Sequence, residues 1–107
     1  MIDYKFVVLT NAVPGREEEF DRWYDEQHLA DVLAIPGFKA AQRAQIAEGT
    51  EAPYRFCTIY DISSEDIAAT MADLESRANT DRMPLTDAMS KDLVTYMYET
   101  RGAKRIA

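Results

Sequence analysis

The distribution of apolar and polar residues in the sequence predicts four strands. Residues 4–10 and 54–62 are rich in β-branched and aromatic side chains, which favours strands, and turn residues close the first segment at 11–15. Residues 38–47 and 92–99 are the other two predicted strands, although the alanines and glutamines of 38–47 are also compatible with a helix. The loop 48–53 suits an antiparallel hairpin between the second and third strands.

Two longer segments between these strands have the period of a helix. Residues 16–35 contain neither proline nor glycine, begin with glutamates that the helix dipole favours, and end at Pro36 and Gly37. The second helix is predicted to begin after Ser63 or Ser64 as its N-cap. Its apolar residues recur at helical spacing and are Ile67, Met71, Leu74 and Ala78. Residues 79–90 are predicted to form a loop with a short helical turn around 85–89.

The predicted order is β-α-β-β-α-β, the ferredoxin-like plait of the α+β class. Two helices can cover only one face of a four-stranded sheet, yet the predicted strands are apolar on both faces. In the first strand Phe6 and Val8 alternate with Val7 and Leu9. The uncovered face predicts a partner, and a second copy of the same sheet is the simplest one, so we expect a homodimer packed through its sheets.

Composition and charge restrict the class of protein. The 107 residues, 47% of them hydrophobic, are typical of one globular domain spanning residues 1–107. The net charge of −7 argues against nucleic-acid binding, and the third strand, 55–60, lacks the glycines of RNA-recognition modules that share this element order. No apolar run approaches the ~20 residues of a membrane span and no signal peptide opens the chain, so no membrane partner is expected.

Cysteine and histidine each occur once, which limits redox and metal chemistry. A lone Cys57 cannot form an internal disulfide, and this predicts a reducing, cytoplasmic location. A single histidine, His28, together with that cysteine cannot supply a closed zinc site. We therefore expect no metal and no other cofactor.

Four polar side chains gather on one face of the first predicted helix. On a regular helical wheel Tyr24, Gln27 and Asp31 lie along this face, with His28 at its margin. His28 follows Tyr24 by four residues and precedes Asp31 by three, so both are within reach of its ring on a continuous helix. We interpret His28 as a candidate general acid/base whose tautomer Asp31 or Tyr24 fixes. The alternative is a histidine bonded to a carboxylate for stability alone.

Further residues are candidates for binding a substrate. Trp23, Tyr60 and Tyr96 would line an aromatic cleft, although core packing is the ordinary role of such side chains. Gln27 adds a polar group beside them. Arg43 would anchor a carboxylate, or it would form a surface salt bridge.

The segment Trp23–Phe38, with the sequence WYDEQHLADVLAIPGF, resembles the EthD-like branch of the dimeric α+β barrel superfamily. The shared features are an aromatic residue near the end of the first helix, a histidine a few residues later, and an aliphatic run into Pro-Gly-aromatic. The resemblance implies a ferredoxin-like protomer whose sheet joins that of a second copy. It places the family's helix-one histidine at His28 and its aromatic residue at Tyr24. The superfamily also includes haem enzymes, and haem use here would require His28 as the axial ligand.

Two functions of different classes follow from these observations. The first is a small enzyme that acts on an aromatic or polyketide-like compound by cofactor-independent acid/base chemistry, as a monooxygenase, isomerase, cyclase or lyase. Its site would be a cleft between the first helix and the sheet. The second is a non-catalytic small-molecule-binding or accessory subunit of a catabolic or biosynthetic pathway. An accessible ring with a neutral-range pKa at His28 favours the enzyme, whereas a ring sealed in a salt bridge favours the binding protein.

Overall fold

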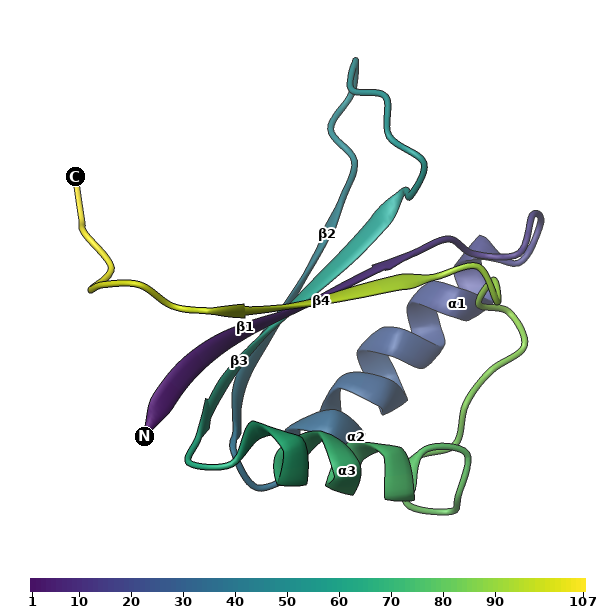
Figure 1. Ribbon diagram of the computed structural model, residues 1–107. Helices are drawn as coiled ribbons and strands as arrows, with labels where there is room; N and C mark the ends of the chain where they lie inside the picture. Colours follow the sequence, from purple (N-terminus) through teal and green to yellow (C-terminus); the bar gives the residue numbers. More distant parts are fainter.

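The computed structural model describes all 107 residues and contains one four-stranded sheet with helices on one of its faces (Figure 1). The strands are β1 (Ile2–Thr10), β2 (Phe38–Gln45), β3 (Phe56–Ser64) and β4 (Val94–Glu99). Their order in the sheet is β2-β3-β1-β4, and every neighbouring pair is antiparallel. The predicted ferredoxin-like α+β class is confirmed, because the helical connections join β1 to β2 and β3 to β4 across an intervening strand.

The pairing register divides the strands into two faces. Phe6 of β1 lies opposite Tyr60 of β3 and Met97 of β4, so these three side chains share the face that the helices cover. Val7 lies opposite Ile59 and Tyr96, which share the other face. No helix covers that second face, where Ile59 is 39% and Tyr96 49% exposed. We call it the open face.

The first helical segment is divided into three parts. It consists of the α-helix α1 (Glu17–Trp23), the π-helical turn η1 (Tyr24–His28) and the α-helix α2 (Leu29–Leu33). The Leu29 amide donates to the Tyr24 carbonyl, a bond that spans five residues instead of four. The sequence therefore predicts the extent of this helix but is wrong about its continuity. Gly37 ends the segment at φ +101°, a conformation that glycine adopts more easily than other residues. It lies close to the Ser63 carbonyl and has no side chain to crowd this turn.

The second helix begins later than the sequence predicts. β3 continues to Ser64, which pairs with Ile2, so neither Ser63 nor Ser64 is the N-cap. Asp66 caps α3 (Ile67–Arg77) instead, and its carboxylate accepts a hydrogen bond of 3.1 Å from the Ala69 amide. The apolar residues predicted for this helix pack against the core, as expected.

Residues 78–93 form an irregular loop that returns from α3 to β4 and passes beside α1 (Figure 1). The predicted helical turn around 85–89 is absent, and a non-helical turn at Asp87 takes its place. Hydrogen bonds to the loop after β1 hold this part, since the Val13 amide donates to the Ala88 carbonyl at 2.7 Å and the Ser90 amide to the Asn11 carbonyl at 2.8 Å.

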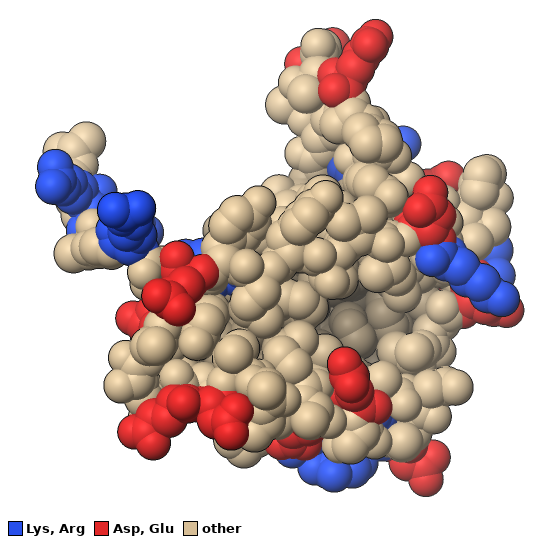
Figure 2. Space-filling model, viewed as in Figure 1, with Lys and Arg blue, Asp and Glu red and all other residues tan.

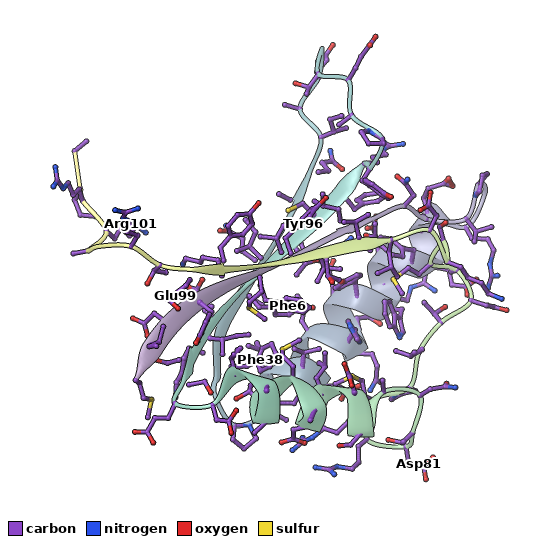
Figure 3. All side chains as sticks on the ribbon, viewed as in Figure 1. Phe6, Phe38, Asp81, Tyr96, Glu99 and Arg101 are labelled. Carbon is purple, nitrogen blue, oxygen red and sulfur yellow. The ribbon has the colours of Figure 1, made fainter.

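The core lies between the covered sheet face and the helices, in two neighbouring groups of buried side chains. The larger group joins the sheet to α2 and the loop 78–93, and consists of Phe6, Val32, Ile35, Phe38, Tyr60, Ile62 and Met83. The smaller group lies under α1 and consists of Phe20, Tyr24, Phe56 and Ala88. Figure 3 shows Phe6 and Phe38 on the helix side of the sheet and Tyr96 on the opposite side.

Two segments project from this body. One is the loop between β2 and β3, and the other is the exposed tail after β4, where Lys and Arg side chains gather (Figure 2). None of the helices has the length and apolar character needed to cross a membrane.

Candidate functional site

A small cavity of about 150 Å³ lies between the helices and the covered face of the sheet. Nine of its eleven lining residues are hydrophobic. The sheet, the first helical segment, α3 and the loop 78–93 all contribute to it, with the residues Phe6, Val8, Tyr60, Thr95, Tyr24, His28, Val32, Leu74, Ala78, Met83 and Leu85. Figure 2 shows a hollow on this side of the molecule, beside β4 and in front of the first helical segment.

The π-helical turn η1 positions the imidazole of His28. Its wider turn brings residues five apart in sequence onto the same side, so that His28 lies beneath Trp23. The two rings are stacked, with centroids 4.3 Å apart and planes 20° from parallel. The Tyr24 ring meets the imidazole edge-on at 5.1 Å and 89°. Two aromatic side chains therefore fix the orientation of His28.

His28 lines the cavity without any hydrogen bond to the protein. Its Nδ1 atom is buried and has no partner. Burial lowers the pKa of His28 to about 4, against a smaller opposing influence of the Asp31 carboxylate. The imidazole is therefore neutral at pH 7, and no protein group uses the hydrogen-bonding capacity of its Nδ1 atom. Its pKa lies below the neutral range expected for the enzyme, and no salt bridge seals the ring.

Asp31 and Gln27 bond to each other and not to the imidazole. The Gln27 side-chain amide donates to the Asp31 carboxylate at 2.7 Å. Gln27 is exposed, and neither residue lines the cavity. The π-helical turn explains this arrangement, because it rotates His28 away from the positions that a regular wheel assigns. Asp31 therefore acts on His28 only through its charge.

Two buried tyrosines belong to the cavity lining. Tyr24 from η1 and Tyr60 from β3 are each 2% exposed. Burial, and after it the neighbouring Tyr24 hydroxyl, raises the pKa of Tyr60 well above its usual value. Tyr60 therefore stays protonated, with its hydroxyl beside that of Tyr24.

Arg43 lies behind the site and not in it. From β2 it donates to Asp21 at 2.8 Å and to Asp25 at 3.0 Å, and both carboxylates belong to the helical segment above it. Although burial lowers the pKa of Arg43, these hydrogen bonds raise it above its ordinary value. Of the two roles that the sequence leaves open for Arg43, the salt bridge therefore describes its contacts within one protomer.

Trp23 and Tyr96 differ in their relation to the cavity. Trp23 does not line it directly but stacks on His28 and donates from its indole Nε1 to the Pro84 carbonyl at 3.1 Å. Tyr96 lies on the open face, where its ring centroid is 6.4 Å from that of Tyr98. Tyr60 and Tyr96 thus belong to opposite faces, and the structure does not bring all the predicted aromatic residues together.

Sequence reasoning missed the contribution of the loop 78–93. Met83 is buried and Leu85 half-exposed, and both line the cavity. The available signal was weak, because the apolar residues Met83, Leu85, Ala88 and Met89 follow neither the period of a strand nor that of a helix.

Comparisons with known proteins show the fold. No family model matches the chain, and no curated protein is similar to it in sequence. A candidate monooxygenase from Shewanella loihica is similar in structure with a TM-score of 0.58 at 19% identity, over 97% of each chain. A dimeric ferredoxin-like protein of unknown function from Thermobifida fusca has a TM-score of 0.60 at 18% identity, over 92% of each chain.

Two further structures extend this comparison. MhuD, in a form with manganese protoporphyrin IX bound, has a TM-score of 0.62 at 13% identity, over 97% of this chain and 98% of that one. An EthD family protein from Bacillus halodurans has a TM-score of 0.53 at 15% identity, over 94% of this chain and all of that one. The chain therefore has the ferredoxin-like α+β fold that the EthD family protein and the dimeric ferredoxin-like protein share, as the resemblance of its first helix implies.

Proposed function

We propose that this protein is a small-molecule enzyme that binds a single-ring aromatic compound, or one of similar size, and uses His28 as a general base. The observation that carries the proposal is an imidazole without a hydrogen-bond partner in the lining of a mostly apolar cavity. Buried polar atoms are nearly always paired in proteins, so an unpaired one at a cavity indicates a role toward a ligand.

The size and lining of the cavity indicate the class of ligand. An apolar cavity of roughly 150 Å³ is large enough for a benzene ring, as the handling of benzene by an engineered cavity of that size in another protein shows. The lining here adds His28 as an acceptor and Tyr60 as a donor. A phenol-like molecule satisfies both, with its ring against the apolar side chains and its hydroxyl directed at the imidazole.

The chemistry supported by this arrangement is transfer of one proton. The ligand hydroxyl donates to the neutral His28 ring, and the proton moves to the ring nitrogen as the ligand becomes an anion. The low pKa of the free imidazole opposes this step, whereas the anion formed beside it stabilises the imidazolium in a medium of low dielectric constant. Tyr60 lines the same cavity, and its hydroxyl would turn from Tyr24 to donate a hydrogen bond to the anion. No cofactor takes part in the step.

The second candidate function is a protein that binds the same ligand without chemistry. The pKa of His28 is the observation in its favour, because general bases work best with a pKa near the operating pH and about 4 is well below it. Such a protein would serve as an accessory subunit for an enzyme of aromatic or polyketide-like metabolism.

We also propose that the protein is a homodimer packed through its open faces. The open face exposes large hydrophobic side chains on two strands, Ile59 on β3 and Tyr96 and Tyr98 on β4. The dimeric ferredoxin-like protein from Thermobifida fusca has the same fold and supports this assembly. A sheet that is apolar on both sides is most simply covered by its own copy.

Haem does not fit the cavity. The MhuD structure holds manganese protoporphyrin IX, and the volume of about 150 Å³ is well below the ~300–1,000 Å³ of pockets that bury drug-sized ligands. We therefore derive no step through a porphyrin.

A binding experiment with small aromatic probes tests this proposal. Phenol, anisole and benzene differ in whether they donate, accept or form no hydrogen bond, and calorimetric or NMR titration gives their affinities. We expect phenol to bind more tightly than anisole, by about five- to tenfold for one hydrogen bond. The matched variant His28→Phe keeps an aromatic ring without a nitrogen, and it should bind phenol and anisole equally. Failure of all three probes to bind at millimolar concentration would contradict the proposal.

A further inference from the structure

We propose that Trp23 is the positioning residue of this site, holding the His28 ring on one side and the Met83–Leu85 wall of the cavity on the other. The inference rests on the proposed function only for the role of His28. Trp23 is the only tryptophan and His28 the only histidine of the chain, so both ends of the contact can be observed individually.

The first contact of Trp23 is with the imidazole. Stacking at 4.3 Å and 20° covers one face of a ring that no hydrogen bond orients. The contact depends on η1, because in a regular α-helix residues five apart lie about 140° from each other around the axis. The unusual turn thus has a definite consequence: it places the base under the indole.

The second contact of Trp23 is with the loop 78–93. Its indole N–H donates to the carbonyl of Pro84 at 3.1 Å. Pro84 separates Met83 and Leu85, and both of these line the cavity. Backbone hydrogen bonds also hold Met83, from its amide to the Thr80 carbonyl and from the Asn79 amide to its own carbonyl, and further along the Val13 amide donates to Ala88. The indole is therefore the side-chain anchor at the middle of the wall.

One side chain accordingly connects the base with the wall opposite it. A ligand in the cavity packs against this wall, since Met83 and Leu85 both line it. A shift of the wall strains the Trp23–Pro84 bond, and the stacked indole transmits that strain to the imidazole. Trp23 thereby couples the position of the wall to the orientation of the base.

Two substitutions separate the two contacts. Trp23→Phe keeps an aromatic face for His28 but has no N–H for Pro84, whereas Trp23→Leu removes both. Local opening of the wall is measured by the rate at which trypsin cleaves after Arg82. Met83, on the other side of that peptide bond, is 1% exposed, so this part of the chain must open locally before the bond is cut. Cleavage after Arg101, in the exposed tail, serves as the internal control.

The imidazole is followed by NMR titration of the single histidine. We expect Trp23→Phe to raise the rate of cleavage after Arg82 about three- to tenfold, the effect of one lost hydrogen bond, and to leave the titration midpoint where it is in the wild type. Trp23→Leu should raise both the cleavage rate and the midpoint, the latter by at least one pH unit as water reaches the ring. Cleavage after Arg101 should not change in either variant.

An unchanged cleavage rate in Trp23→Phe, or an unchanged midpoint in a folded Trp23→Leu, would overturn the inference. If Trp23→Leu does not fold, the imidazole proton shifts decide: the indole ring current should move them upfield in the wild type and much less in Trp23→Phe, and equal shifts would overturn the inference. All these measurements use the ligand-free protein. Failure of phenol to bind would therefore contradict the proposed function alone.

Discussion

The guanidinium of Arg43 lies 4.7 Å from the centre of the Tyr24 ring. Arg43 belongs to β2 and Tyr24 to η1, so this cation–π contact joins the sheet to the turn that carries His28. The same guanidinium bonds to Asp21 one turn earlier and to Asp25 within η1. The Arg43 guanidinium thus supports the π-helical turn from the sheet side, and two carboxylates fix the guanidinium in place.

Replacing Arg43 should therefore destabilise the protein and leave the affinity of the cavity unchanged. Arg43→Met keeps the apolar stem and loses the charge, and we expect it to lower the free energy of unfolding by about 1.5–3 kcal/mol, the lower end reflecting the exposure of both aspartates. Chemical denaturation measures this loss. A drop in the affinity of the folded variant for phenol, without loss of stability, would instead place Arg43 in the ligand site.

Stability should depend on the protonation of His28. Its pKa is about 4 in the folded protein and near 6.5 when unfolded, so between these values the unfolded chain binds more protons. The free energy of unfolding should therefore rise as the pH increases from 4 to 6.5 and remain level, as far as His28 is concerned, above that. The shift corresponds to about 2–4 kcal/mol in total.

The control for this pH dependence is His28→Gln, which cannot titrate. The free energy of unfolding of both proteins is measured by denaturation across pH 4–7. The carboxylates contribute equally to both, so the difference between the two free energies is due to the imidazole. Curves that remain parallel over the whole range would show that burial does not suppress protonation of His28.

Assembly can be tested with one charge on the open face. Ile59→Lys places an ammonium group where we propose that the partner's sheet packs, and it should convert the dimer to a folded monomer, because Ile59 is already 39% exposed in the single chain. Leu33→Lys is the matched control, since Leu33 has the same exposure but lies on α2, away from the open face. Sedimentation at micromolar concentration gives both masses. A wild type that sediments at 12.2 kDa would contradict the dimer.

Gly37 should tolerate a side chain less well than Gly49. Both have positive φ, at +101° and +83°, so alanine costs about 1 kcal/mol or more at either position. A Cβ at Gly37 would also lie 3.3 Å from the Ser63 carbonyl, whereas none of the surrounding atoms lies within 4 Å at Gly49. Gly37→Ala should therefore lower the melting temperature clearly more than Gly49→Ala does. Equal losses would mean that the α2–β2 turn shifts to relieve the contact.

The sequence predicts the fold well because β-branched and aromatic runs mark its strands and helical spacing of apolar residues marks its helices. Alternation places Phe6 and Val7 on opposite faces, and the register of β1 with β3 and β4 confirms that assignment. The cap of α3 is misplaced by two residues or more, because Ser64 extends β3 and Asp66 provides the better-placed carboxylate. Such boundaries depend on tertiary pairing, which no local pattern contains.

The candidate site is less predictable for a physical reason. A helical wheel assumes 100° for each residue, and one π-helical turn changes the direction of every later side chain relative to it. In the structure with that turn, His28 stacks on Trp23, and Asp31 accepts a hydrogen bond from Gln27. The spacing of the residues does not predict the π-helical turn, so the pairing of His28 with an indole instead of a carboxylate has no signal in the sequence.

The stacking of Trp23 on His28 gives the protein a built-in optical probe. With one indole in the chain, all tryptophan fluorescence comes from a ring 4.3 Å from the imidazole. A protonated imidazole in contact with an excited indole quenches its emission, whereas a neutral one does so far less. The unmodified protein should therefore lose fluorescence as His28 becomes charged, and a ligand that transfers a proton to His28 should dim the same signal at neutral pH.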